Sequence, residues 1–240
     1  MQETIEVLAG SARSPIRILG GLTAATLLAW WIYVPVHELL HALGCVLAGG
    51  SVSELRIGIL YGGGILEKLI PFVRGGGEYA GQLSGFATGG SDLVHLATDF
   101  LPFVATLFGA VALLRFARRT GSFVWFGAGF VLVAAPLISL PGDFYEMGSI
   151  VAGNLLEWVS GGGAGAGWDL LRTDDLFRLL ADFPRRFPER HILWGTAVGL
   201  SAATGYLLAT ATLAASRLIA DLVIPVETLF QARKSSGHRS

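Results

Sequence analysis

Long apolar runs without a charged residue constrain this chain more than any other feature of its sequence. Residues 18–36 and 121–140 contain no Asp, Glu, Lys, Arg or His. A helix that crosses the hydrocarbon core of a bilayer needs about 20 mostly apolar residues, so both runs are close to spanning length. The composition agrees, since only 15% of the 240 residues are charged and 52% are hydrophobic, against about 25% charged residues in a typical soluble domain. The sequence therefore predicts a membrane protein.

We predict an all-α polytopic membrane protein with four to five transmembrane helices. Glu146 and Glu157 interrupt one of the candidate runs, which is why the number is not fixed. The expected spans are residues 18–47, 93–114, 121–140, 144–159 (the interrupted run) and 192–226. Such a chain is expected to be a multi-pass protein of the cell membrane, with the lipid bilayer as its surroundings. A net charge of −1 gives no reason to expect a nucleic-acid partner.

The segments between these runs complete the expected organisation. A small membrane-associated β-element is predicted in the glycine-rich residues 49–92, between the first two helices, because apolar and polar residues alternate in "SELRIGILY". A second strand is expected in "EYAGQLSGF". The expected divisions are an N-terminal segment 1–17, a membrane core 18–159, a linker with an interfacial amphipathic helix 160–191, a final transmembrane helix 192–226 and a disordered tail 227–240.

The first apolar run contains the motif "HELLH", with His37, Glu38 and His41. Residues four apart lie on the same face of a helix, so both imidazoles can bind one Zn²⁺ ion while Glu38 lies beside it. Ionisable residues are costly at bilayer depth, which favours a functional role over a buried hydrogen-bond cluster. We therefore predict one zinc site in this helix. Cys45 follows one turn later, and we expect it not to be a ligand.

A catalytic zinc site usually has three protein ligands, so one is missing from the motif. Asp143 is the favoured candidate. It lies about 33 Å along the third run from Gly121, a depth similar to that of His37, which lies about 28 Å along the first run from Ile18. Both runs are expected to start from the cytoplasmic side, so these two positions reach the same depth. The preceding "SLPG" breaks the helix and frees the carboxylate. Glu146 or the pair His95 and Asp99 are the alternatives.

These features resemble the site-2 protease family of intramembrane zinc metalloproteases. The resemblance covers residues 18–150 and rests on "HELLH" in the first core helix and on the aspartate of "PGD" after the third. "DFLPFVATLFGAVALL" occupies the place of the family's Gly-Pro-x-x-Asn helix, with Thr106 as its nearest polar residue. The resemblance implies zinc held by His37, His41 and Asp143.

The activity that this resemblance implies is hydrolysis of peptide bonds by a zinc metalloendopeptidase. Glu38 would be the general base, and the substrate a membrane-spanning or membrane-anchored protein. The strand edge 55–61 is expected to hold an unwound substrate segment by strand addition. Two other classes remain open. One is a metal-binding regulatory or assembly protein of the membrane without protease activity, and the other is a proton-coupled transporter, although the chain has no visible repeat.

Overall fold

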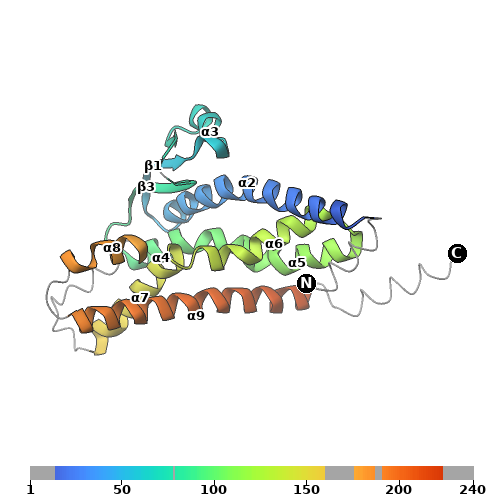
Figure 1. Cartoon of the computed structure of the whole chain (residues 1–240). Coiled ribbons are helices and arrows are strands. Elements are labelled where there is room, and N and C mark those ends of the chain that lie inside the picture. The colour runs from blue at the N-terminus through green and yellow to red at the C-terminus, as the bar shows by residue number, and fades with distance from the viewer. Residues whose placement is uncertain (1–13, 78, 160–175, 187–190, 224–240) are drawn as a thin grey trace. The chain divides into compact units, whose positions relative to one another are not determined.

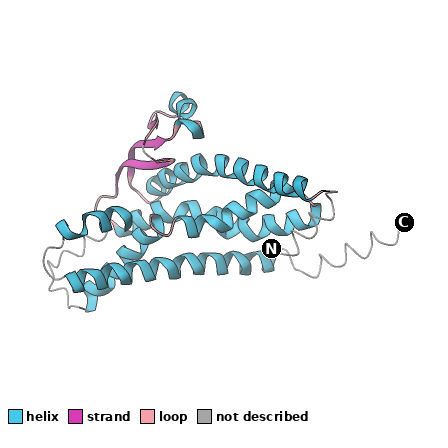
Figure 2. Cartoon of the chain, viewed as in Figure 1, coloured by secondary structure: helices cyan, strands magenta, loops and turns pink. Residues whose placement is uncertain are grey.

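The computed structural model describes residues 14–77, 79–159, 176–186 and 191–223. Most of them are helical, and the described strands form one small sheet (Figure 2). The helices are α2 (Pro15–Leu47), α3 (Gly63–Leu69), α4 (Asp92–Phe100), α5 (Val104–Thr120), α6 (Phe123–Ile138), α7 (Asp143–Val159), α8 (Leu176–Arg186) and α9 (His191–Val223), with 3-10 turns η1 (Ile59–Tyr61) and η2 (Leu101–Phe103) (Figure 1). The predicted tail, most of the N-terminal segment and residues 160–175 of the linker lie outside the described residues.

In the part of the chain that the structure describes, three segments are long and apolar enough to cross a membrane: Pro15–Leu47, Asp92–Thr120 and Ile192–Val223. A fourth span exists only if α6 and α7, which form a bent pair, are counted together. The prediction of apolar helices of spanning length is thus confirmed; among the described residues there are three, or up to four, against the predicted four to five. Helices α6 and α7 have 16 and 17 residues, and each alone is shorter than the roughly 20 residues that a span needs.

The described chain divides into two compact units, and α2, α6 and α9 each contribute residues to both. The first unit contains residues 14–33, 103–135 and 212–223. Its helices approach closely at Gly127, where an added Cβ would lie 2.5 Å from the Ala25 carbonyl oxygen. The buried Thr106 hydroxyl donates a hydrogen bond to the Leu132 carbonyl oxygen (2.9 Å). Thr106 therefore links α5 to α6 inside this unit.

The second unit contains the sheet and comprises the described residues within 34–102 and 136–211, namely 34–77, 79–102, 136–159, 176–186 and 191–211. Its strand order is β2 (Val73–Gly75), β1 (Ser51–Ile57), β3 (Gly81–Ala87). Strand β1 pairs in parallel with β2 and antiparallel with β3. The Glu54 carboxylate accepts hydrogen bonds from Arg56 Nε (2.7 Å) and from the Ser84 hydroxyl of β3 (2.9 Å). The bond from Arg56, and then that from Ser84, lowers the pKa of the Glu54 carboxyl.

Strand β1 is shorter than predicted, and its place in the sheet differs from what strand addition at 55–61 requires. Leu55 and Ile57 are fully buried, but the strand ends there and the chain turns into η1. Gly62, with φ 82°, caps that turn. Because β1 lies between β2 and β3, Arg56 and Ile57 pair with a strand on each side, and Leu55 pairs with β2. Within the described residues, the second edge of β3 carries no strand partner.

Helices α7 and α9 cross at small residues within this second unit. An added Cβ at Gly148 would lie 2.3 Å from the Ser201 carbonyl oxygen, and one at Gly205 would lie 2.2 Å from the Phe144 carbonyl oxygen. Only glycine permits so close an approach of two backbones, which is a common way for helices to pack in membranes. The crossing fixes the N-terminal turn of α7, where Asp143 lies.

Helix α8 corresponds to the described part of the predicted amphipathic helix. Its apolar residues divide between two sides. Leu179 is fully buried and packs with Tyr145 of α7 and Val198 of α9. Phe177 and Leu180 are exposed. One apolar side of α8 is therefore covered by the protein itself.

Candidate metal centre

The two motif histidines and Asp143 converge on one point in the second unit. His37 Nε2 lies 3.1 Å from His41 Nε2 and 3.2 Å from Asp143 Oδ2. His41 Nε2 lies 3.6 Å from Asp143 Oδ1. Both histidines are buried, and their rings meet edge to face at 84°. Two imidazole nitrogens from α2 and one carboxylate from α7 thus face one another, although His37 and Asp143 are 106 positions apart in the sequence.

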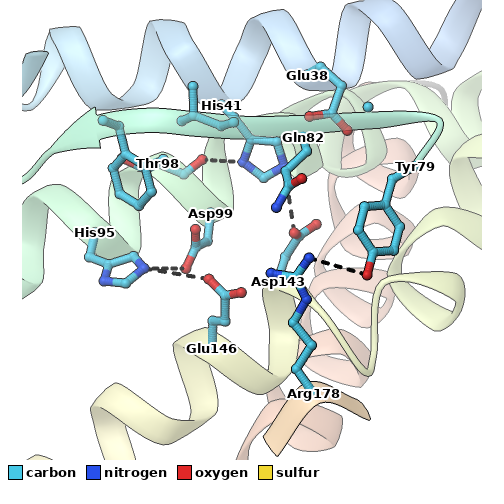
Figure 3. Close-up of a pocket in the computed structure, with 13 residues that line it drawn as sticks. Glu38, His41, Tyr79, Gln82, His95, Thr98, Asp99, Asp143, Glu146 and Arg178 are labelled. Carbon is cyan, nitrogen blue, oxygen red and sulfur yellow. Dashed lines mark hydrogen bonds and ion pairs between the residues drawn. The ribbon is translucent and has the colours of Figure 1, made fainter. Parts of the chain in front are cut away.

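A backbone carbonyl orients the second histidine. His41 Nδ1 lies 2.8 Å from the Thr98 carbonyl oxygen of α4 (Figure 3). A carbonyl only accepts hydrogen bonds, so Nδ1 carries a proton, and in the neutral imidazole the Nε2 lone pair is directed at His37 and Asp143. Metal-binding histidines usually donate their other ring N–H in this way.

Gly44 explains how α4 comes close enough to make that bond. It lies three residues after His41, and an added Cβ would be 2.4 Å from the Ala97 carbonyl oxygen. Any larger residue would push α4 away from α2. The Thr98 hydroxyl donates to the Val94 carbonyl oxygen of its own helix (2.7 Å). The carbonyl of Thr98 is therefore the group that reaches His41.

Asp143 is placed by the break that the sequence predicts. Residues 139–142 form a turn, and Asp143 is the first residue of α7. The turn is tied to α8, because the Leu176 amide donates to the Pro141 carbonyl oxygen (2.8 Å). The close crossing at Gly205 holds the next residue, Phe144, against α9.

These three side chains fit a zinc ion. Bonds of 2.0–2.2 Å at tetrahedral angles place ligand atoms about 3.3–3.5 Å apart. The two Nε2 atoms lie 3.1 Å apart, and each lies near that value from one Asp143 oxygen, His37 at 3.2 Å from Oδ2 and His41 at 3.6 Å from Oδ1. Two imidazoles and a carboxylate are ligands that zinc accepts, and three of them leave a fourth position open. The His41 tautomer also suits a cation, because a lone pair rather than a proton is directed into the site.

Glu38 lies beside the histidines and packs against β3. One carboxylate oxygen of Glu38 and a ring nitrogen of each histidine lie within 4.8 Å of one another. An added Cβ at Gly81 would lie 2.2 Å from Glu38 Cγ. The strand therefore covers the glutamate side chain, and glycine at this position leaves the room that the side chain occupies.

A cavity of about 310 Å³ opens onto these groups. Glu38, His41 and Asp143 line it, together with residues of β3, α4, α7 and α8. At its border the Arg178 guanidinium of α8 donates to the Tyr79 hydroxyl (3.3 Å) and lies 5.4 Å from the centre of the Tyr79 ring (Figure 3). The site is thus connected to a space large enough for part of a peptide.

The alternatives to Asp143 form a separate group. His95, Asp99 and Glu146 each offer a ligand atom within 4.8 Å of the others, and all three line the same cavity. The Cys45 sulfhydryl, in contrast, is buried and lies 3.6 Å from the Ser51 carbonyl oxygen. Its hydrogen-bond partner therefore belongs to β1.

Sequence reasoning missed three groups that shape this site: Gly44, Gly81 and the Thr98 carbonyl. Gly44 follows the motif in "HELLHALG", so its spacing from His41 was visible as a small residue on a neighbouring position of the helix. Gly81 and Thr98 have no such signal, because only the folded chain brings them to the motif.

Comparison of the chain with protein-family models, with curated proteins and with solved structures gave no match.

Proposed function

We propose that this chain is an intramembrane zinc metalloprotease similar to the site-2 protease family. The observation that carries the proposal is the convergence of His37, His41 and Asp143, with Glu38 beside them, in a predominantly apolar helical protein. A bound zinc ion would polarise a water molecule and the scissile carbonyl, and would lower the pKa of that water. The substrate class is a membrane-spanning or membrane-anchored protein.

Glu38 is the general base of the proposed reaction. Its carboxylate accepts the proton of the attacking water and then delivers it to the nitrogen of the leaving amine. The His41 imidazole keeps its orientation through the Nδ1–H bond to the Thr98 carbonyl oxygen (2.8 Å). Gly81 holds the Glu38 side chain on the cavity side by close contact. Each of these groups acts from a helix or strand, which favours a fixed geometry over a mobile one.

Strand β3 is the proposed docking edge for the substrate, in place of residues 55–61. A helix hides its peptide groups in its own hydrogen bonds, so a substrate must unwind before its carbonyl is accessible. Gly81, Gln82, Leu83 and Phe86 of β3 line the cavity, and the outer edge of β3 carries no strand partner among the described residues. An extended peptide added to that edge would lie beside Glu38.

The test compares membranes of cells that make the wild-type protein with membranes of cells that make Glu38→Gln at equal level. Glu38→Gln keeps the shape of the side chain but cannot accept a proton. We expect new protein N-termini, within or next to transmembrane segments, in the wild-type membranes only, measured by mass spectrometry of N-terminal peptides. The matched control is Glu157→Gln, an exposed glutamate at the far end of α7, which should keep the wild-type pattern.

Zinc content decides what a negative result means. Glu38→Gln should retain the metal of the wild-type protein, because the glutamate is not one of the three proposed ligands. Identical N-termini from wild type and Glu38→Gln, with zinc bound to both, would refute the protease and favour a non-proteolytic metal-binding role.

A further inference from the structure

A second group of metal-ligand side chains lies between α4 and α7. His95 Nε2 is 3.6 Å from Asp99 Oδ2 and 3.5 Å from Glu146 Oε2 (Figure 3). Two of these residues come from α4, one turn apart, and the third comes from the first turn of α7. The two helices are also joined beyond the cluster, where Asn154 Nδ2 donates to Asp92 Oδ2 (2.8 Å). The contact between α4 and α7 therefore fixes the two helices that carry the cluster.

Two polar atoms of this cluster are buried without a hydrogen bond. Asp99 is only 4% exposed, and neither its Oδ2 nor His95 Nε2 has a hydrogen-bond partner. A buried carboxylate oxygen without a partner is costly, and more so in a protein surrounded by lipid. Both atoms are directed at each other across 3.6 Å, which exceeds the usual 2.7–3.2 Å of a hydrogen bond. A group or ion that interacts with both atoms is therefore needed between them.

We propose that His95, Asp99 and Glu146 form a second divalent-cation site, distinct from the His37–His41–Asp143 centre. Separations of 3.5 and 3.6 Å are too long for hydrogen bonds but match the roughly 3.3–3.5 Å between ligand atoms of a tetrahedral ion. One imidazole with two carboxylates is a ligand set for a transition-metal ion, with zinc as the reference. Since Glu38, His41 and Asp143 line the same cavity as this cluster, both ions would be reached from one space.

The competing occupant is a proton. A protonated His95 between two carboxylates would offset one of their two negative charges, but it would bind no metal. The two occupants differ in metal stoichiometry: a second cation site gives two zinc ions per chain, whereas an imidazolium gives one.

The test uses the full-length protein, purified in detergent, stripped of metal with a chelator and reloaded with Zn²⁺ alone. Metal per chain is counted by mass spectrometry after excess zinc is removed. We expect two zinc ions for the wild type and for the control Glu157→Gln, and one for Asp99→Asn and for Glu146→Gln. His37→Ala should also bind one, and the double variant His37→Ala/Asp99→Asn none.

The single variants show at the same time whether the fold is intact. One zinc retained by Asp99→Asn reports an undamaged first centre, so a loss of the second ion is then specific. Loading with Co²⁺ gives a second readout, since the visible absorption of Co²⁺ should fall by about half in Asp99→Asn and in Glu146→Gln. One zinc in the wild type would overturn the proposal, and so would two in Asp99→Asn. Complete loss of zinc from both Asp99→Asn and Glu146→Gln would also overturn it, because the two groups would then not be separate sites.

Discussion

Replacing Gly44 by alanine tests how the structure orients His41. The added Cβ would lie 2.4 Å from the Ala97 carbonyl oxygen, whereas ordinary contact begins at 3.4 Å. The α4 backbone must therefore recede by about 1 Å. Because Thr98 is the next residue, its bond to His41 Nδ1, now 2.8 Å, would lengthen to about 3.8 Å and be lost.

The expected consequence is weaker zinc binding in a protein that still folds. Loss of a partner that orients a metal ligand costs about 10–100-fold in metal affinity, or about 1.4–2.7 kcal/mol. Overpacking between α2 and α4 should add about 1–3 kcal/mol of destabilisation. The zinc dissociation constant is measured by competition with a chromophoric chelator, in a Glu146→Gln background so that only the first centre is titrated.

Gly20→Ala is the matched control for this experiment. Gly20 lies in the same helix, and an added Cβ there meets nothing within 4 Å. It should keep the zinc affinity of the parent protein. If Gly44→Ala and Gly20→Ala bind zinc equally well, the Thr98 carbonyl does not hold His41 in place, and the proposed role of the α2–α4 contact is refuted.

Three further variants test the rest of the centre. Gly81→Ala should displace the Glu38 side chain, which lies 2.2 Å from the added Cβ, so proteolysis measured from new N-termini should fall while zinc content stays at the wild-type value. Cys45→Ser should leave zinc content unchanged, and a loss of metal would make the thiol a ligand. Gly205→Val should push α7 away from α9, because even an added Cβ would lie 2.2 Å from the Phe144 carbonyl oxygen. Zinc binding by the neighbouring Asp143 should weaken. Unchanged zinc affinity would show that the crossing of α7 and α9 does not position Asp143.

The sequence was most informative where residue type and spacing carry the geometry. Two histidines four residues apart on a helix must share a face, and the structure places their Nε2 atoms 3.1 Å apart. The break at Pro141 and Gly142 likewise predicts a free carboxylate at Asp143, which lies 3.2 Å from His37. These inferences need only local rules of helix geometry.

Local rules of helix geometry do not predict contacts between distant segments of the chain. His95, Asp99 and Glu146 were considered only as alternatives to Asp143, because no spacing shows that α4 and α7 bring them together apart from the histidine motif. The pairing of β1 between two strands was missed for a similar reason. Val73–Gly75 is too short to show alternation, so the sequence does not reveal that residues 55–57 have a neighbour on that side.

The acceptor that orients His41 is a main-chain atom, and this has a consequence for how such a centre can diverge. Every amino acid carries a carbonyl, so replacing Thr98 does not remove the acceptor, provided that α4 keeps its path. Selection then acts on the small residue at position 44, which admits the neighbouring helix, rather than on position 98 itself. A lineage could therefore exchange almost all residues around the motif and still inherit the same imidazole orientation.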